Sequence, residues 1–197
     1  MTNKLSSLDP TYFDRVYQAN ADPWSFESSP YERDKYAATI AALPNERYKS
    51  GFEPGCSIGV LTQLLAQRCD HLLAVDASEL PLQKARARLT NAPNVALRQM
   101  NIPAEFPDGP FDLIILSEVG YYWAMPDLTR ARQLIIDRLQ PGGHLLLVHW
   151  TPLVHDYPLT GDQVHDFFLE STQPNSPLQH LMNQRQDTYR LDLFEKK

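Results

Sequence analysis

The chain has 197 residues, of which 43% are apolar and 21% are charged, a composition typical of one globular domain. Its net charge of −6 disfavours a nucleic-acid-binding protein, because phosphate binding requires a basic face. The two cysteines fit a reducing compartment, and no apolar run approaches the roughly 20 residues of a membrane span. We expect a cytoplasmic protein with neither membrane nor nucleic-acid partners, since the start MTNKLSSLDP also lacks the apolar stretch of a secretory signal.

Residues 1–48 are predicted to carry two helices. Asp9 is a typical helix cap, and a proline follows it at the first helical position, so the first helix is expected over residues 9–20. Ser29 is the expected cap of a second helix over residues 30–43, which a following proline ends. We interpret this region as a helical lid or cap that precedes the core of the domain.

Residues 49–197 form the expected core, in which short apolar runs alternate with helical patterns. The runs are GFEP, HLLAVD, VALRQM, FDLIILS and GHLLLVHW, and the helical stretches between them lie near 60–67, 79–89 and 127–139. Strands that are apolar almost throughout are typical of a parallel sheet covered on both faces. A helix at 161–170 follows, and LQHLMNQRQ and TYRLDLFEK predict two closing strands. The alternation predicts a single-domain, doubly wound α/β fold with a mostly parallel seven-stranded sheet.

A short loop, EPGCSIG, directly follows the first predicted strand and is the first candidate binding element. Ligands of open α/β sheets bind beyond the carboxyl ends of the strands, where a tight turn lets backbone N–H groups approach them. Gly55 and Gly59 suit such a turn, and Cys56 and Ser57 lie between them. Glu53 suits a ligand that carries a cationic amine, whereas the dinucleotide pattern G-x-G-x-x-G is incomplete. The alternative is a plain connection between a strand and a helix.

The tip of the second strand supplies another candidate. Asp76 ends this strand and can accept hydrogen bonds from both hydroxyls of a ribose, with Ala77 and Ser78 beside it. The alternative for Asp76 is a helix cap, a role for which Ser78 competes.

Two more strand tips complete the expected cofactor site. After the third strand, Asn101 can bond an adenine amino group, and Met100 or Ile102 can pack on the ring. A loop asparagine is otherwise usually a turn residue. The residues at the tip of the fourth strand, where an acid opens toward the same site, are Ser117, Glu118 and Val119.

Taken in this order, these motifs resemble the class I S-adenosylmethionine-dependent methyltransferases and, more narrowly, the nodulation protein S group of N-methyltransferases. The segments that carry the resemblance are DPW at 22–24, SPYERDKY at 29–36, EPGCSIGVLT at 53–62, LAVDAS at 73–78, FDLIILSEVGYYW at 111–123 and LQPGGHLLLVH at 139–149. The resemblance implies S-adenosylmethionine as methyl donor, S-adenosylhomocysteine as product, and a sheet that closes with an antiparallel hairpin. It also implies a small-molecule acceptor with an amino group, an amino sugar in the best-known members. The chain differs at Ser57, where the superfamily usually has glycine, and at 149–166 on the expected acceptor side.

The expected acceptor side follows from the chemistry of methyl transfer. Transfer from a sulfonium is an in-line displacement, so the enzyme must align donor and acceptor and keep water out. An amine acceptor must arrive neutral, and a nearby base helps it to do so. The candidates after the fourth and fifth strands are Glu118, Tyr121, Tyr122, His149, His155 and Asp156.

Each acceptor-side candidate has a structural alternative. Glu118 can act as a cap or in a salt bridge, His149 can be a satisfied buried histidine, and the two loop residues that follow can simply shape their loop. On one extended segment Tyr121 and Tyr122 point to opposite faces, so one of them is expected to pack. The histidines expected to lie outside the site are His144 and His165.

The second N-terminal helix precedes the cofactor strand, so it can lie across the site as a lid. In this hypothesis Arg33 pairs with the carboxylate of the cofactor, while Trp24, Tyr31 and Tyr36 close over its sulfonium by cation–π attraction. In the alternative, Trp24 and Tyr36 pack on the sheet and Arg33 stays solvated.

We therefore expect a methyltransferase that acts on an amino group of a small molecule, as a monomer or small homo-oligomer. Methylation of oxygen or carbon is the alternative within the same class. Outside it, the alternatives are a cofactor-binding module without catalysis and a dinucleotide-dependent oxidoreductase, which the incomplete glycine pattern disfavours. No metal is expected, because scattered histidines do not make a metal site.

Overall fold

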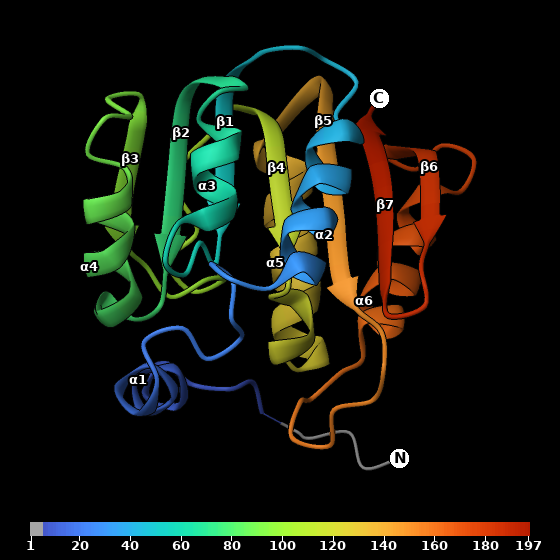
Figure 1. Cartoon of the computed structure of the whole chain (residues 1–197). Coiled ribbons are helices and arrows are strands. Elements are labelled where there is room, and N and C mark those ends of the chain that lie inside the picture. Colours follow the sequence, from blue (N-terminus) through green and yellow to red (C-terminus); the bar gives the residue numbers. More distant parts are fainter. Residues whose placement is uncertain (1–5) are drawn as a thin grey trace. The chain divides into compact units, whose positions relative to one another are not determined.

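The computed structural model describes residues 6–197, and its seven strands belong to one sheet of order β3-β2-β1-β4-β5-β7-β6 (Figure 1). The pairs β1–β2, β2–β3 and β4–β5 are parallel, and β7 is antiparallel to both β5 and β6. The order and directions confirm the predicted doubly wound, mostly parallel α/β fold and its closing hairpin. The described residues divide into two compact units, one of residues 9–101 and one of residues 6–8 and 102–197. The division into a lid over 1–48 and a core over 49–197 stays a prediction.

Residues 9–101 contain three parallel strands and four helices. These elements are α1 (Pro10–Ala19), α2 (Pro30–Ala41), β1 (Tyr48–Pro54), α3 (Val60–Leu65), β2 (Cys69–Asp76), α4 (Glu79–Arg88) and β3 (Val95–Gln99). The register pairs Glu53 with Ala74 and Pro54 with Val75, so β1 and β2 end at nearly the same level. The carboxyl ends of these strands therefore bring Glu53 and Asp76 to one edge, and Figure 1 shows α1 beyond the end of β2.

Side-chain caps start the two N-terminal helices where the sequence predicts them. The Asp9 carboxylate accepts the Thr11 N–H at 2.8 Å, and the Ser29 hydroxyl accepts the Glu32 N–H at 3.4 Å. In each helix a proline occupies the first turn, where a missing N–H has no intrahelical partner to lose. Both predicted helices are confirmed.

The second unit contains the other strands of the sheet. Its elements are β4 (Phe111–Ser117), η1 (Gly120–Tyr122), α5 (Met125–Arg138), β5 (Leu139–Trp150), α6 (Gly161–Leu169), η2 (Glu170–Thr172), β6 (Leu178–Arg185) and β7 (Tyr189–Lys196). Residues 113–116 and 145–148 have an exposed fraction of 0%, as expected for strands covered on both faces. Figure 1 shows α5 and α6 behind the strands of this unit.

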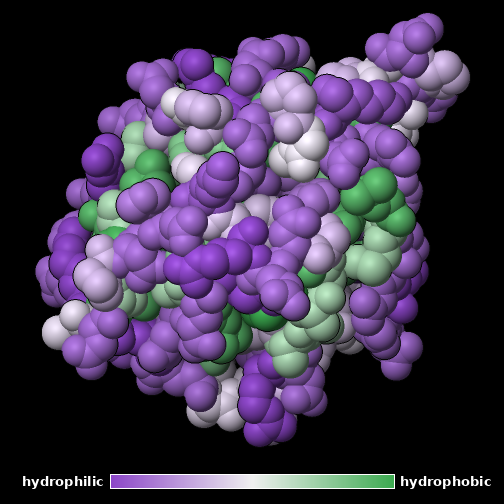
Figure 2. All heavy atoms as spheres, turned by 90° about the horizontal axis from the view of Figure 1, so that it is seen from above, coloured by the Kyte–Doolittle hydropathy of each residue, from purple (hydrophilic) through white to green (hydrophobic). Residues whose placement is uncertain are grey.

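The face of the molecule drawn in Figure 2 is mostly polar. Figure 2 shows one face that is largely hydrophilic, with only small hydrophobic patches. The large apolar side chains that are exposed within the described part of the chain are Leu153 and Leu181. None of the helices within residues 6–197 combines the length and apolar composition that a membrane span requires.

Candidate active site

The loop after β1 turns through left-handed backbone conformations. The φ angles of Gly55, Ser57 and Gly59 are +76°, +51° and +79°. Glycine adopts such angles without a steric cost, whereas serine does not. At Gly59 an added Cβ would lie 3.1 Å from the Cβ of Ala85, so this glycine also lets α4 approach the loop closely.

Ser57, the departure from the usual glycine, has a partner in α1. Its hydroxyl forms a 2.5 Å hydrogen bond with the Tyr17 hydroxyl, and both residues are buried. Burial, together with the charge of Asp76, raises the pKa of Tyr17 well above its usual value, so the phenol keeps its proton. A second bond joins α1 to the neighbouring strand tip, where the Ser78 hydroxyl donates to Asp14 at 2.5 Å. The helix tied to the cofactor loop is therefore α1, although the sequence pointed to α2 as the lid.

Asp76 lies between the loop and α4 with both carboxylate oxygens engaged. One oxygen accepts the Ser57 N–H at 2.9 Å, and the other accepts the Ser78 N–H at 3.0 Å. Burial raises the pKa of Asp76 to about 6, against the lowering effect of these hydrogen bonds. The N-cap of α4 is Ser78, whose hydroxyl accepts the Leu80 N–H. Ser78, and not Asp76, is therefore the N-cap of this helix. Lone pairs of both Asp76 oxygens stay available to a ligand.

Glu53 is the most unusual acid of this unit. Its side chain is buried, and no hydrogen-bond partner for its Oε2 atom is found within residues 6–197. Burial, opposed by the nearby Thr62 hydroxyl and aided by the charge of Asp76, raises the pKa of Glu53 to about 7. A buried carboxylate with one oxygen lacking a donor is costly unless it binds a proton or a cation. This orphaned oxygen fits the ammonium group of S-adenosylmethionine.

The other predicted cofactor residues of this unit lie around the same strand tips. The Cys56 thiol is buried and its pKa is raised well above the usual value by burial, so it is a neutral thiol. The Met100 N–H donates to the backbone oxygen of Asp76 at 2.9 Å, which fixes the segment after β3. Asn101 follows with an exposed side chain, and the Ala77 carbonyl accepts a bond from Gln99. Ile102 is buried but belongs to the second unit, as do Ser117, Glu118 and Val119.

The predicted aromatic lid residues divide into two groups. Trp24 contacts Tyr17 and Phe26, and Phe26 in turn contacts Tyr36, which forms a continuous aromatic cluster. The ring of Tyr31 instead contacts the buried Lys35, whose ammonium lies 5.1 Å from the centre of that ring. Arg33 does not belong to the cluster: its side chain is 75% exposed and pairs with its neighbour Asp34. The structure favours the solvated alternative for this arginine, and its role toward the cofactor stays a prediction.

Glu118 occupies the tip of β4 in a left-handed conformation, with φ +56°. Its Oε2 atom accepts the Trp150 N–H at 3.0 Å and a short hydrogen bond from the Tyr121 hydroxyl. Burial chiefly, and the charge of Glu118, raise the pKa of Tyr121 well above its usual value. The half-buried carboxylate and the protonated phenol therefore form one polar unit at this strand tip.

The expectation that residues 121 and 122 lie on an extended segment is wrong. The chain turns there into the short helix η1, and both Tyr121 and Tyr122 are buried. Their rings contact each other at 4.7 Å, and each contacts Tyr157, with Tyr121 stacked at 5.0 Å. The turn lets both side chains pack together, which an extended strand would prevent.

His149 is fully buried near the end of β5, and both of its ring nitrogens are engaged. Its Nε2 accepts the Gly120 N–H at 3.0 Å, and its Nδ1 lies 3.1 Å from Nε2 of His165. His165 in turn reaches Asp192 at 2.6 Å. These contacts favour the satisfied buried alternative for His149. His165, which was expected to lie outside the site, belongs to this cluster; the available signal was Asp192, an acid within an apolar strand pattern.

The remaining acceptor-side candidates lie on the loop between β5 and α6. His155 and Asp156 are both exposed there, and their roles stay predictions. His144 lies within β5, buried, 3.6 Å from Glu195.

A family model and several curated relatives match this chain. Residues 13–149 match the family "Nodulation protein S (NodS)". Nodulation protein S of Rhizobium tropici is 28% identical over 129 residues, which are 64% of this chain and 53% of that protein. The chain thus spans about half the length of this relative and of its Bradyrhizobium diazoefficiens counterpart, where the share is 49%.

Solved structures extend the similarity over most of the chain. A crystal structure described as a putative methyltransferase from Pseudomonas syringae is 38% identical, with a TM-score of 0.73, and the match covers 84% of this chain and 99% of that one. The N-methyltransferase NodS from Bradyrhizobium japonicum WM9, solved in complex with S-adenosylhomocysteine, is 23% identical with a TM-score of 0.80 over 94% and 97% of the two chains. At that identity it shows the shared fold. The family match over residues 13–149, together with the confirmed fold, shows that the chain belongs to the nodulation protein S family.

Proposed function

We propose that this protein is an S-adenosylmethionine-dependent methyltransferase that methylates an amino group of a small molecule. The family membership and the name N-methyltransferase carried by a structural relative support this function. The observation that carries it is the buried Glu53, whose unpartnered oxygen lies at the same strand edge as Asp76. Two carboxylates in these positions match a ligand with a cationic amine and a ribose diol.

The residues that would hold the cofactor follow from this match. Glu53 would accept the ammonium group, and Asp76 the two ribose hydroxyls. Asn101 and Met100 would contact the adenine, and the loop from Gly55 to Gly59 would leave room for close approach of the backbone. When bound, S-adenosylmethionine supplies an electrophilic methyl group on its sulfonium.

On the acceptor side, Glu118 and Tyr121 are the groups proposed to orient the amine. The carboxylate of Glu118 accepts hydrogen bonds and favours transfer of a proton away from an arriving ammonium. Because Tyr121 already donates to this carboxylate, the phenol fixes the direction in which the remaining lone pairs point. The packed rings of Tyr121, Tyr122 and Tyr157 would exclude water beside this carboxylate.

The proposal is tested by incubating the protein with labelled S-adenosylmethionine and a panel of amines, amino sugars, alcohols and carboxylic acids. We expect methylated amines, identified by mass spectrometry, and a loss of about 100-fold in rate for E118Q. The matched control is E46Q, which makes the same change at an exposed residue. Methylation of oxygen alone would reject the amine as acceptor, and binding of S-adenosylhomocysteine without any turnover would reject the enzyme.

A further inference from the structure

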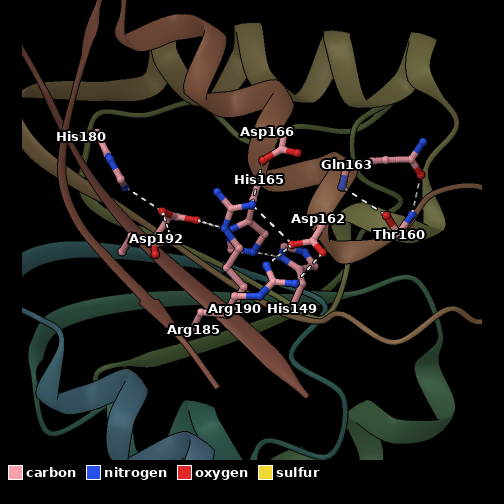
Figure 3. Close-up of polar contacts among 11 residues, drawn as sticks. His149, Thr160, Asp162, Gln163, His165, Asp166, His180, Arg185, Arg190 and Asp192 are labelled. Carbon is pink, nitrogen blue, oxygen red and sulfur yellow. Dashed lines mark hydrogen bonds and ion pairs between the residues drawn. The ribbon is translucent and has the colours of Figure 1, made fainter. Parts of the chain in front are cut away.

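A chain of buried polar groups crosses the second unit and is not used by the proposed chemistry (Figure 3). It links Asp192 on β7 to His165 on α6 and then to His149 on β5, at 2.6 Å and 3.1 Å. All three side chains have an exposed fraction of 0%. The chain ends at 3.0 Å on the backbone N–H of Gly120, the first residue of η1. Three buried polar groups in series are costly unless every donor meets an acceptor.

The backbone N–H at one end fixes the position of every proton in this chain. Because Gly120 can only donate, Nε2 of His149 must accept, and the neutral ring carries its proton on Nδ1. That proton points at Nε2 of His165, which must also accept, so the second ring carries its proton on Nδ1 as well. The last donor meets the carboxylate of Asp192. Both histidines are therefore neutral, each in one defined tautomer.

Asp192 is built to remain an acceptor. Its Oδ2 accepts from Arg190 as well as from His165, and its Oδ1 accepts from His180 and Asn183. Although burial opposes it, His165, Asn183 and Arg190 hold the pKa of Asp192 down to about 2. Burial lowers the pKa of His165, which keeps that ring neutral beside the carboxylate. Figure 3 shows His165 between Asp192 and His149.

Gly120, where this chain of hydrogen bonds ends, is tightly packed. An added Cβ at Gly120 would lie 2.7 Å from Val164 and 3.0 Å from the His149 ring, so the turn fits tightly against α6 and β5. At Gly161 an added Cβ would lie 2.2 Å from the Trp150 carbonyl, which shows how closely α6 approaches the end of β5. Glu118 directly follows β4 in this turn, and Tyr121 lies within η1 next to Gly120.

We infer that His165 and Asp192 are positioning residues, which hold His149 in the tautomer that anchors Gly120 and thereby fix the turn that carries Glu118 and Tyr121. This inference rests on the proposed acceptor-side role of that turn. His149 acts here as a hydrogen-bond acceptor for the backbone, and both of its nitrogens are occupied in doing so. It differs from a base, which would need a free nitrogen facing the substrate.

Glutamine substitutions separate these two roles. A glutamine at position 149 can accept the Gly120 N–H with its oxygen and donate to His165 with its amide, but it cannot take up a proton. For the panel amine that is methylated, we expect H149Q to lose less than about 10-fold in kcat and H149L about 10- to 100-fold, because leucine leaves buried partners unsatisfied. The same order is expected of H165Q and H165L. The control is H71Q, which makes the same change at an exposed histidine of β2 outside this chain of hydrogen bonds and should match the wild type.

Two measurements on the free protein decide the inference without turnover. Nitrogen-15 NMR of the histidine side chains is expected to show His149 with its proton on Nδ1, and the Gly120 amide should exchange slowly with solvent. In H165L this amide should exchange at least about 10-fold faster. Calorimetry with S-adenosylhomocysteine should give wild-type affinity for H149Q and H165Q, which verifies the fold.

The outcomes distinguish this inference from the proposed function. A proton on Nε2 of His149, or unchanged Gly120 exchange in H165L, would overturn the positioning role even if the enzyme methylates amines. Equal losses of kcat in H149Q and H149L would make His149 a base instead. A protein that methylates nothing but shows the expected tautomer and exchange would keep the anchored turn and remove only the proposed reaction.

Discussion

Glu53 should couple binding of the cofactor to release of a proton. Its pKa is raised from 4.5 to about 7, mainly by burial. Since each tenfold change in an acid constant is worth about 1.4 kcal/mol, ionising Glu53 in the free protein costs about 3 kcal/mol more than ionising an ordinary glutamate. An ammonium group beside the carboxylate offsets this cost and binds only the ionised form. Proton and ligand therefore compete for the same oxygen.

The competition gives a defined dependence on pH. With a pKa of about 7, Glu53 alone should weaken binding of S-adenosylhomocysteine about 100-fold between pH 8 and pH 5. At pH 7 about half of the sites are protonated, so binding should release about half a proton. Calorimetric titrations in buffers of different ionisation enthalpy measure both quantities.

The E53Q variant and a truncated ligand provide the controls. E53Q should bind S-adenosylhomocysteine more weakly at pH 8 and should lose the proton release at pH 7. 5′-Methylthioadenosine lacks the amino-acid end, so its affinity should not respond to E53Q. If wild-type affinity for S-adenosylhomocysteine is independent of pH from 5 to 8, or if both ligands respond to E53Q equally, Glu53 does not hold the ammonium group.

E53Q, which is expected to weaken ligand binding, should stabilise the fold of the free protein. A carboxyl group whose pKa is raised in the folded state contributes stability below its unfolded pKa of 4.5, and this contribution is lost as the pH rises through about 7. Without ligand at pH 8, E53Q should therefore raise the free energy of unfolding by up to about 3 kcal/mol in urea titrations. An E53Q variant that is destabilised at pH 8 would show that contacts of the carboxylate in the free protein, such as that with the Thr62 hydroxyl, outweigh its cost of burial.

Two further substitutions test the neighbouring contacts. D76N should weaken S-adenosylhomocysteine and 5′-methylthioadenosine alike, by about 10- to 100-fold in calorimetry, because both ligands carry the ribose diol; a loss confined to one of them would contradict this role. G59A should lower the free energy of unfolding by about 1–3 kcal/mol more than G142A, because both have positive φ but only the first would press a methyl group against α4. Equal losses in urea titrations would show that the approach of α4 is not tight.

The sequence pattern could predict the layers of this fold because buried strands appear in it as apolar runs. Residues 113–116 and 145–148 are uninterrupted apolar runs, and the structure buries them on both faces of the sheet. Caps such as Asp9 and Ser29 are equally local, since a hydroxyl or carboxylate reaches an N–H two or three residues away. The strand tips that carry Glu53 and Asp76 follow from the same patterns.

Contacts between distant elements could not be predicted in this way. The bond from Tyr17 to Ser57 spans 40 positions and involves a phenol that has no motif around it. The bond from His165 to Asp192 spans 27 positions, and its histidine lies on a helix without a distinguishing pattern. The turn at 120–122 depends on tertiary contacts to β5 and α6, so local propensity gave an extended segment instead.

Three buried acids of the chain differ in where their hydrogen-bond donors come from. Asp192 receives donors from four side chains, and its pKa falls to about 2 despite burial. Asp76 receives backbone donors, yet its pKa stays raised at about 6, so the protein satisfies it only in part. Glu53 has an oxygen for which the described residues offer no donor, and its pKa is about 7. A carboxylate that receives donors from its own chain needs no ligand, so Asp192 is a structural acid. Asp76 and, more so, Glu53 lack such donors in part, and a cationic nucleoside would supply them.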